Sequence, residues 1–302
     1  MPRAQRDFIM INSTFRTPID SLEYFALLVA GETELPLAET AANIAQIQYP
    51  ELSLSDIANK LDQLTQNLQC SIKGNLSTLH KIGSLNEYLY QDLNFRGNSY
   101  DTHNNIDLSC INFALECKRG SDAIMSIIYL EVANALQLQA RGIIFPKQIL
   151  IKIRLLRPNG LPAEVIISPL TGKSLNMEDI QQLLAPFKNQ HGLIGEYDIP
   201  CDLFLETATS KDIITNILFQ MKSVYQNQDA WSPLIQVLDR LIVLQPDHID
   251  NYRERGYAHI KNKQPQKAIT DLEHYLQHAR TQFVSDAHII EQELNLLRGA
   301  LS

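Results

Sequence analysis

One apolar segment, residues 121–138, limits the possible folds of this 302-residue chain more than any other part. Ser121 can cap a helix, and Asp122 then falls in the first turn, where a carboxylate is favourable. The apolar side chains that follow would lie on nearly every side of this helix, which is typical of a helix buried at the centre of a domain. Polar residues interrupt the segment, so it falls short of the ~20 apolar residues that a membrane span needs.

Helical patterns precede this segment. Ser53 and Asp56 form a capping-box pattern, Arg96-Gly97-Asn98 reads as a turn, and Lys118-Arg119-Gly120 reads as a basic helix end followed by glycine. Helices are expected within residues 21–68, 85–93 and 108–117.

Strand patterns follow the central segment. Residues 142–145, 149–156 and 164–167 are rich in Ile, Leu and Val, and Pro158-Asn159-Gly160 predicts a hairpin turn between two of them. Helices followed by a run of strands indicate an α+β domain with an antiparallel sheet.

The composition excludes several classes of protein. An apolar fraction of 45% and a charged fraction of 20% are ordinary for a globular chain. The net charge of −8 argues against a surface built to neutralise nucleic acid or anionic lipid, since such surfaces need an excess of Lys and Arg. Residues 1–15 hold no apolar block long enough for a signal peptide, so we expect a cytoplasmic protein.

The four cysteines, Cys70, Cys110, Cys117 and Cys201, form no CxxC pair and lie in no tight spacing with histidine. This spacing supports neither a zinc site nor a disulfide. We expect buried reduced thiols that pack as small apolar groups. No metal or cofactor is predicted.

The last third of the chain repeats itself. Residues 215–248 and 249–282 are two windows of 34 residues, which is the tetratricopeptide period. Signature places of that repeat are occupied by Leu218, Tyr225, Leu238, Leu241 and Pro246 in the first window and by Tyr252, Gly256, Ala268, Leu272 and Tyr275 in the second. We expect a capping helix over 285–301. Two repeats bury little surface alone, so they should dock on the preceding domain.

The order of segments resembles the bacterial Sir-B type family, which joins a transglutaminase-like domain to C-terminal tetratricopeptide repeats. The similarity covers about residues 21–300 and rests on short blocks at 37–39, 41–45, 93–98, 118–120, 129–133, 144–146 and 252–256. It implies a loose arm over 1–20, a transglutaminase-like, papain-related α+β domain over 21–205, and an all-α tetratricopeptide-like domain over 206–302.

The resemblance also implies where catalytic residues would lie. Members of the wider superfamily use a Cys-His-Asp triad, in which the cysteine opens the central helix shortly after a glycine. Carried onto this chain, the cysteine's place two after Gly120 is Asp122, the histidine's place two after Pro146 is Gln148, and the aspartate's place before Pro169 is Ser168. Many Sir-B type members lack the cysteine but keep the other two residues, so this chain departs further.

These replacements predict a pseudoenzyme. A carboxylate is a weaker nucleophile than a thiolate, an amide cannot accept the proton, and a hydroxyl cannot stabilise an imidazolium. We then expect Asp122 to be a carboxylate that stabilises the first turn of its helix. Gln148 and Ser168 are expected to belong to a buried hydrogen-bond network. Two alternatives remain open in the old cleft: a residual or altered amide hydrolase or acyl transferase, and a sensor of a small ligand.

Three further patterns have simple structural explanations. Thr171-Gly172-Lys173-Ser174 resembles the end of a phosphate-binding loop, but Ile167 stands where the first glycine is required. His274 and His278 have a chelating spacing without a third ligand, which favours an exposed helix face. His103 lies in a polar segment that reads as a surface loop.

The repeats offer the remaining candidate site, a groove for a protein or peptide partner. Its lining is expected from Phe219 and from Arg253, Tyr257 and Lys261, and the two cations beside Tyr257 suit an acidic or C-terminal peptide. The alternative is that these residues face the first domain or solvent. The sequence thus predicts a non-catalytic interaction scaffold or regulator and leaves its partner and oligomeric state open.

Overall fold

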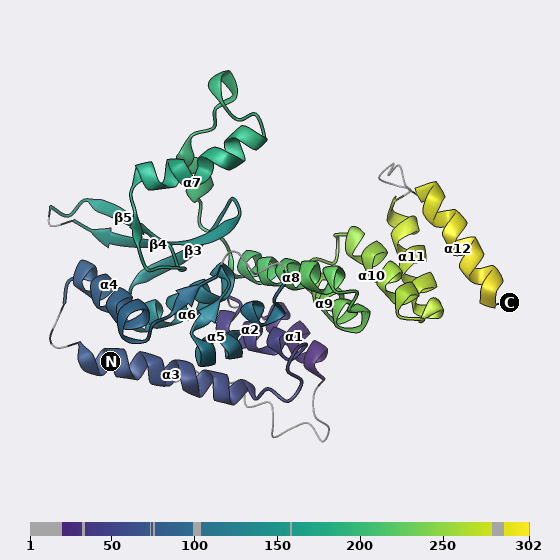
Figure 1. The fold of residues 1–302 in the computed structure, drawn as a ribbon, viewed down its shortest axis with the longest axis horizontal. Coiled ribbons are helices and arrows are strands. Elements are labelled where there is room, and N and C mark those ends of the chain that lie inside the picture. Colours follow the sequence, from purple (N-terminus) through teal and green to yellow (C-terminus); the bar gives the residue numbers. More distant parts are fainter. Residues whose placement is uncertain are drawn as a thin grey trace.

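The computed structural model describes residues 20–31, 34–72, 74, 76–98, 104–157, 159–279 and 287–301. It confirms the predicted class: a mixed domain with an antiparallel sheet precedes a helical arm (Figure 1). Of the predicted N-terminal arm, residues 1–19 lie outside this description. Asp20 is the N-cap of the first helix.

Helices before the sheet build one body of the domain. They are α1 (Ser21–Ala30), α2 (Leu37–Ala45), α3 (Leu54–Ser71), α4 (Thr78–Asn86), η2 (Glu87–Asp92), η3 (Ile106–Ser109), α5 (Ile111–Cys117) and α6 (Asp122–Ala135). Ser53 caps α3, and Ser121 caps α6 by accepting a hydrogen bond from the Ile124 N–H. Almost every side chain of α6 is buried, as its all-round apolar pattern predicts.

The sheet is antiparallel in the order β3 (Gln139–Phe145), β4 (Gln148–Leu156), β5 (Pro162–Ile167) and β6 (Ser174–Leu175). Side chains of a strand alternate between its two faces. Ile149, Ile151 and Ile153 of β4 pack with α6, whereas Leu150 packs on the other face with Ile143 and Ile166.

A helix absent from the sequence prediction, α7 (Met177–Gln190), covers that second face together with the short turn η5 (Cys201–Leu205). Another short turn, η4 (Gly195–Tyr197), lies between them in the sequence. Only Ile180 and Leu184 of α7 are buried, so its periodic signal is weak. Its capping box, Asn176 with Asp179, was the available clue. The sheet therefore lies between α6 and α7 (Figure 1).

Two local predictions need correction. Arg96 and Gly97 are not a free turn: as β1 (Arg96–Gly97) they pair in parallel with β2 (Arg119–Gly120). The left-handed residue that ends α5 is Lys118, with φ 60°, and not Gly120. Gly97 is needed because a Cβ there would lie 2.7 Å from the Cα of Leu170.

The helical arm consists of α8 (Ser210–Asn227), α9 (Trp231–Leu244), α10 (Asp250–Lys261), α11 (Pro265–Ala279) and α12 (Ala287–Leu301). Its last three helices, α10 to α12, extend away from the mixed domain and end with the C-terminus (Figure 1). Gly256 allows α10 and α11 to pack closely, since a Cβ would lie 2.9 Å from two carbons of Leu272. This agrees with the role of glycine in the predicted repeat.

The first repeat is part of the core of the mixed domain. Apolar side chains of α8 and α9 belong to the same buried cluster as α6 and β4. The buried Arg240 of α9 strengthens this union by donating hydrogen bonds to the Ser21 hydroxyl and to Asn43 Oδ1. By contrast, α11 and α12 pack around a separate cluster that contains Leu272, Tyr275 and Leu294.

These two clusters predict different effects of shortening the chain. A chain ending after Gln245 keeps the large cluster and should unfold cooperatively, whereas a chain ending at Leu205 loses the α8 and α9 side chains that fill it. Circular dichroism melting of both chains would measure this. A cooperative, full-length-like melt of the chain ending at Leu205 would contradict the shared core.

Candidate functional site

Asp122, in the predicted cysteine position, is a buried structural acceptor. Its side chain lies at the start of α6 and is 8% exposed. Pairing of β4 with β5 begins at Ile151, so no β5 residue lies opposite Ile149. Asp122 Oδ2 accepts a hydrogen bond from the Ile149 N–H instead. The carboxylate therefore satisfies a backbone donor at the point where the sheet loses a strand.

The other carboxylate oxygen is bound from the helical arm. Gln220 of α8 donates from Nε2 to Asp122 Oδ1 at 3.2 Å and to Asn216 Oδ1 at 2.9 Å. Asp122 thus joins three elements that are distant in sequence: α6, β4 and α8. Gln220 Oε1 is buried without a hydrogen-bond partner among the described residues.

The pKa of Asp122 is raised above its ordinary value of 3.8. Burial is the largest cause, because it disfavours the charged form, and the hydrogen bonds from Ile149 and Gln220 oppose it. A carboxyl group with a raised pKa and both oxygens engaged is poorly suited to act as a nucleophile.

The structure does not assemble Gln148 and Ser168 around Asp122. Gln148 lies opposite Phe145 in the β3–β4 register, and alternation along β4 places it on the α7 face with Leu150. Ser168 follows β5 and begins the turn to β6. No hydrogen bond joins the side chains of these three residues in the described part of the chain. The predicted three-residue network is therefore replaced by Asp122, Ile149 and Gln220.

Packing closes the turn that follows Ser168. The Tyr90 hydroxyl donates a hydrogen bond of 2.6 Å to the Pro169 carbonyl, and the Gly97 N–H donates one of 2.9 Å to the Leu170 carbonyl. Gly172 adopts φ +71°, and a Cβ there would overlap the Tyr90 ring. Thr171-Gly172-Lys173-Ser174 is thus a tight turn that leads into β6 instead of directly into a helix. The N-terminus of α7, which follows β6, is capped by its own Asn176 and Asp179.

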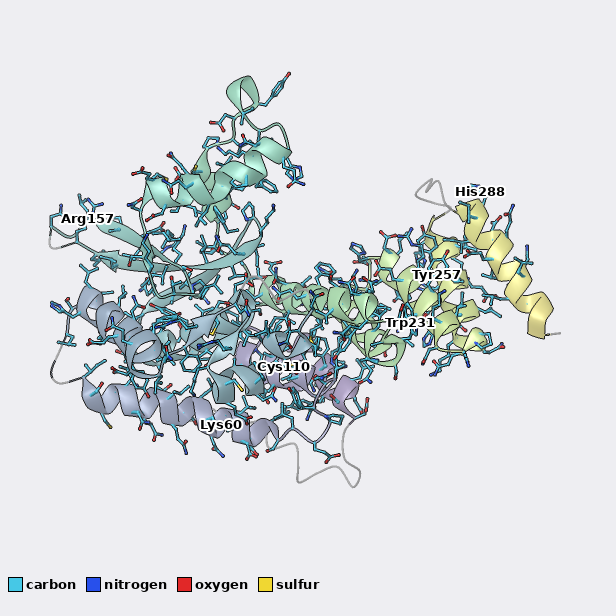
Figure 2. The ribbon with its side chains drawn as sticks, in the orientation of Figure 1. Lys60, Cys110, Arg157, Trp231, Tyr257 and His288 are labelled. Carbon is cyan, nitrogen blue, oxygen red and sulfur yellow. The ribbon has the colours of Figure 1, made fainter. Side chains whose placement is uncertain are left out.

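Among the described residues, none of the four cysteines is hydrogen-bonded to Asp122 or to a histidine. Cys110 is fully buried, its Sγ contacts the Ile106 carbonyl at 3.5 Å, and burial raises its pKa well above the ordinary value. Figure 2 shows Cys110 inside the packed helices. Cys70 and Cys117 are exposed and Cys201 is half-buried, so the prediction of buried thiols holds for Cys110 alone. The described histidines make no hydrogen bond to a cysteine or to Asp122.

Of the paired histidines, His278 is exposed as predicted, whereas His274 is half-buried. His274 stacks on Tyr252 with ring centroids 4.0 Å apart, and His278 lies one turn further along α11. Across the described residues, no group of three or more His, Cys, Asp or Glu side chains could hold a metal ion. Nor does any helix of that part have the length and apolar character to cross a membrane. His103 lies outside the described residues.

The predicted groove residues have mixed roles. Arg253 donates to the Tyr275 hydroxyl and pairs with Asp250, and Tyr257 donates to Glu293 Oε2 at 2.7 Å. These two side chains therefore brace α10 against its neighbours α11 and α12; Figure 2 shows Tyr257 within the helical arm. Phe219 is 40% exposed and Lys261 is exposed, so both can meet a partner.

A pair of contacts beside Phe219 joins the two repeats. Lys222 of α8 lies over the Phe219 ring and pairs with Glu254 of α10 at 2.8 Å. An exposed aromatic ring supported in this way loses little conformational freedom on binding, which suits an interaction surface.

Asp122 generates a prediction about pH. Because its folded-state pKa is raised, the folded protein holds this proton more tightly than the unfolded chain. The contribution of Asp122 to the free energy of unfolding therefore falls as pH rises from the ordinary Asp pKa of 3.8 through the raised pKa of the folded state. Asp122→Asn keeps an acceptor for Ile149 and cannot ionise. Its stability relative to the wild type should therefore increase between about pH 4 and pH 7 in urea unfolding.

Asp179→Asn is the matched control. The Asn176 N–H and Lys173 lower the pKa of this exposed carboxyl, so the wild type gains stability from it as pH rises. The relative stability of Asp179→Asn should consequently fall as pH rises, and this change should lie around and below the ordinary Asp pKa of 3.8. A pH-independent difference for Asp122→Asn would show that Asp122 is not held in a charge-disfavouring site.

Comparison with known proteins agrees with this architecture. Residues 55–219 match the transglutaminase-like superfamily, and residues 221–297 match the tetratricopeptide repeat. A UPF0162 protein of Xylella fastidiosa (strain Temecula1) is 29% identical over 83% of this chain and 86% of its own length. Protein SirB1 of Salmonella typhimurium is 22% identical, covering 85% and 90%, and UPF0162 protein YchA of Escherichia coli K12 is 21% identical, covering 86% and 92%. With its buried central helix, antiparallel sheet and docked repeats, the chain belongs to the transglutaminase-like superfamily, and its similarity to SirB1 and to UPF0162 proteins is consistent with a SirB-type family.

Proposed function

We propose that this protein is a non-catalytic, cytoplasmic interaction scaffold. The observation that carries the proposal is the state of Asp122: the group in the nucleophile's place is buried and hydrogen-bonded by Ile149 and Gln220. A side chain used in this way stabilises the join between sheet and arm. Each of its oxygens already accepts a hydrogen bond, and no histidine among the described residues is hydrogen-bonded to it, whereas an activated nucleophile requires an adjacent base.

The repeats supply the surface for a partner. Phe219 is an exposed aromatic residue braced by Lys222, and Lys261 adds an exposed cation on α10. Aromatic residues flanked by charges are typical of the anchoring positions of protein interfaces. Because α8 is fixed in the core of the mixed domain, this surface is rigidly oriented relative to it.

Binding should depend on this surface. We expect Phe219→Ala combined with Lys261→Ala to weaken capture of the protein's partner from native cytoplasm by tenfold or more, in line with the ~2 kcal/mol or more carried by hot-spot residues. Arg253 and Tyr257 are avoided because they brace α10. Leu296→Ala is the control, since Leu296 is 74% exposed on α12. Equal recovery of every binder by the groove variant and the wild type would contradict the proposal.

The scaffold and the enzymatic alternative predict opposite results in an activity assay, and the scaffold predicts no activity. We expect purified protein to show no hydrolysis of amide substrates and no transfer of an amine to glutamine side chains above the uncatalysed rate. Both reactions can be followed by release or incorporation of a fluorescent amine. Turnover that disappears in Asp122→Asn would refute the scaffold and establish an active remnant site, since this change keeps the shape of the side chain.

A further inference from the structure

The outer face of the sheet has a half that α7 does not cover. Ile143, Leu150 and Ile166 occupy the covered half and pack with α7. Further along the same strands, and on the same face by alternation, lie Arg141 of β3 and Lys152 and Arg154 of β4. The apolar half of this face is therefore continued by a basic half.

The pairing of β3 with β4 brings cations of this basic half next to each other, which destabilises the sheet unless anions are nearby. Arg141 and Lys152 are direct cross-strand partners, and like charges directly opposite each other destabilise a sheet. Two carboxylates partly compensate. Glu34 accepts two hydrogen bonds from Arg141, and Glu164 pairs with both Lys152 at 3.1 Å and Arg154 at 3.3 Å. Three cations thus share two anions.

The pKa of Glu164 reflects two opposing effects, burial and the neighbouring cations. Burial disfavours its charged form, but the hydrogen bonds and charges of Lys152 and Arg154 outweigh burial and lower its pKa below the ordinary value. Glu164 is consequently ionised at neutral pH, and one positive charge in the group remains uncompensated.

These cations line a hollow of about 520 Å³, a size that fits a small molecule. Asn134, Gln139 and Thr207 add polar groups to its wall, and Leu138 and Ala140 add apolar ones. Glu34 and Glu164 are not among the lining residues, so the wall carries three cations and no carboxylate. In a chain of net charge −8, this concentration of positive charge needs a reason.

Donor groups remain for a ligand. Within the described residues, Arg154 is hydrogen-bonded through Nε alone and Lys152 makes one ion pair. The planar Arg fork matches the oxygens of a carboxylate or phosphate, and the partly buried Lys152, with 12% of its side chain exposed, provides a charge shielded from water. Two backbone carbonyls at the end of α6 already accept hydrogen bonds from other side chains. The Ala135 carbonyl accepts one from Gln69, and the Leu136 carbonyl accepts one from Lys81.

We propose that this hollow binds a small oxyanionic ligand, a phosphate or polycarboxylate, through Arg141, Lys152 and Arg154. The site goes beyond the scaffold function and lies on a different element from the repeat groove. It would give the protein a means to respond to a small molecule.

Calorimetric titration of the full-length protein with inorganic phosphate and, separately, with citrate would test this site at matched ionic strength. We expect saturable binding of one probe or both, and the probe that binds identifies the oxyanion. Arg154→Gln should weaken that binding by about tenfold, since it removes a charged hydrogen-bond donor at a position where 64% of the side chain is exposed and the fold does not depend on it.

Two further variants complete the test. Lys152→Gln should weaken binding at least as much as Arg154→Gln. Lys60→Gln, which removes an exposed cation paired with Glu116 on α5, should leave binding unchanged. Absence of saturable binding by both probes, or equal weakening in all three variants, would overturn the proposal.

Discussion

The buried carboxylate of Asp122 is the interaction on which the arrangement of this protein depends. A carboxyl group removed from water must have its oxygens hydrogen-bonded, and here one donor comes from the sheet and the other from α8. At this position the chain therefore holds a side chain that links the sheet to the arm.

This connection explains why the repeats do not behave as an appended module. Two tetratricopeptide repeats have too little buried surface of their own, and the first repeat solves this by placing the apolar face of α8 and α9 in the main core. Arg240 adds a buried polar link to α1 and α2, where its donors are satisfied by Ser21 and Asn43. The second repeat and α12 then extend from a base that cannot rotate freely.

Much of the fold could be predicted from the sequence because its strongest patterns are local. The apolar α6, the Ile-rich strands and the 34-residue period each report burial within one element. α7 was missed because it buries only Ile180 and Leu184, and the pairing of Arg96–Gly97 with Arg119–Gly120 was missed because so short a strand has no period. Left-handed Lys118 could not be read from residue type, since glycine two positions later offered the more usual signal.

The candidate site was predictable in position but not in chemistry. The resemblance located Asp122, yet its partner Gln220 lies 98 residues away in a helix assigned to the repeats, and no local pattern connects them. The same limit applies to Arg253 and Tyr257: helix geometry placed them on a groove, whereas packing against α11 and α12 decides that they brace it. A sequence shows which residue type occupies a position. The hydrogen-bond partners of that residue, however, depend on contacts between segments that are distant in the sequence. For Asp122 that second property is the informative one, because both of its oxygens already accept hydrogen bonds from other segments of the same chain.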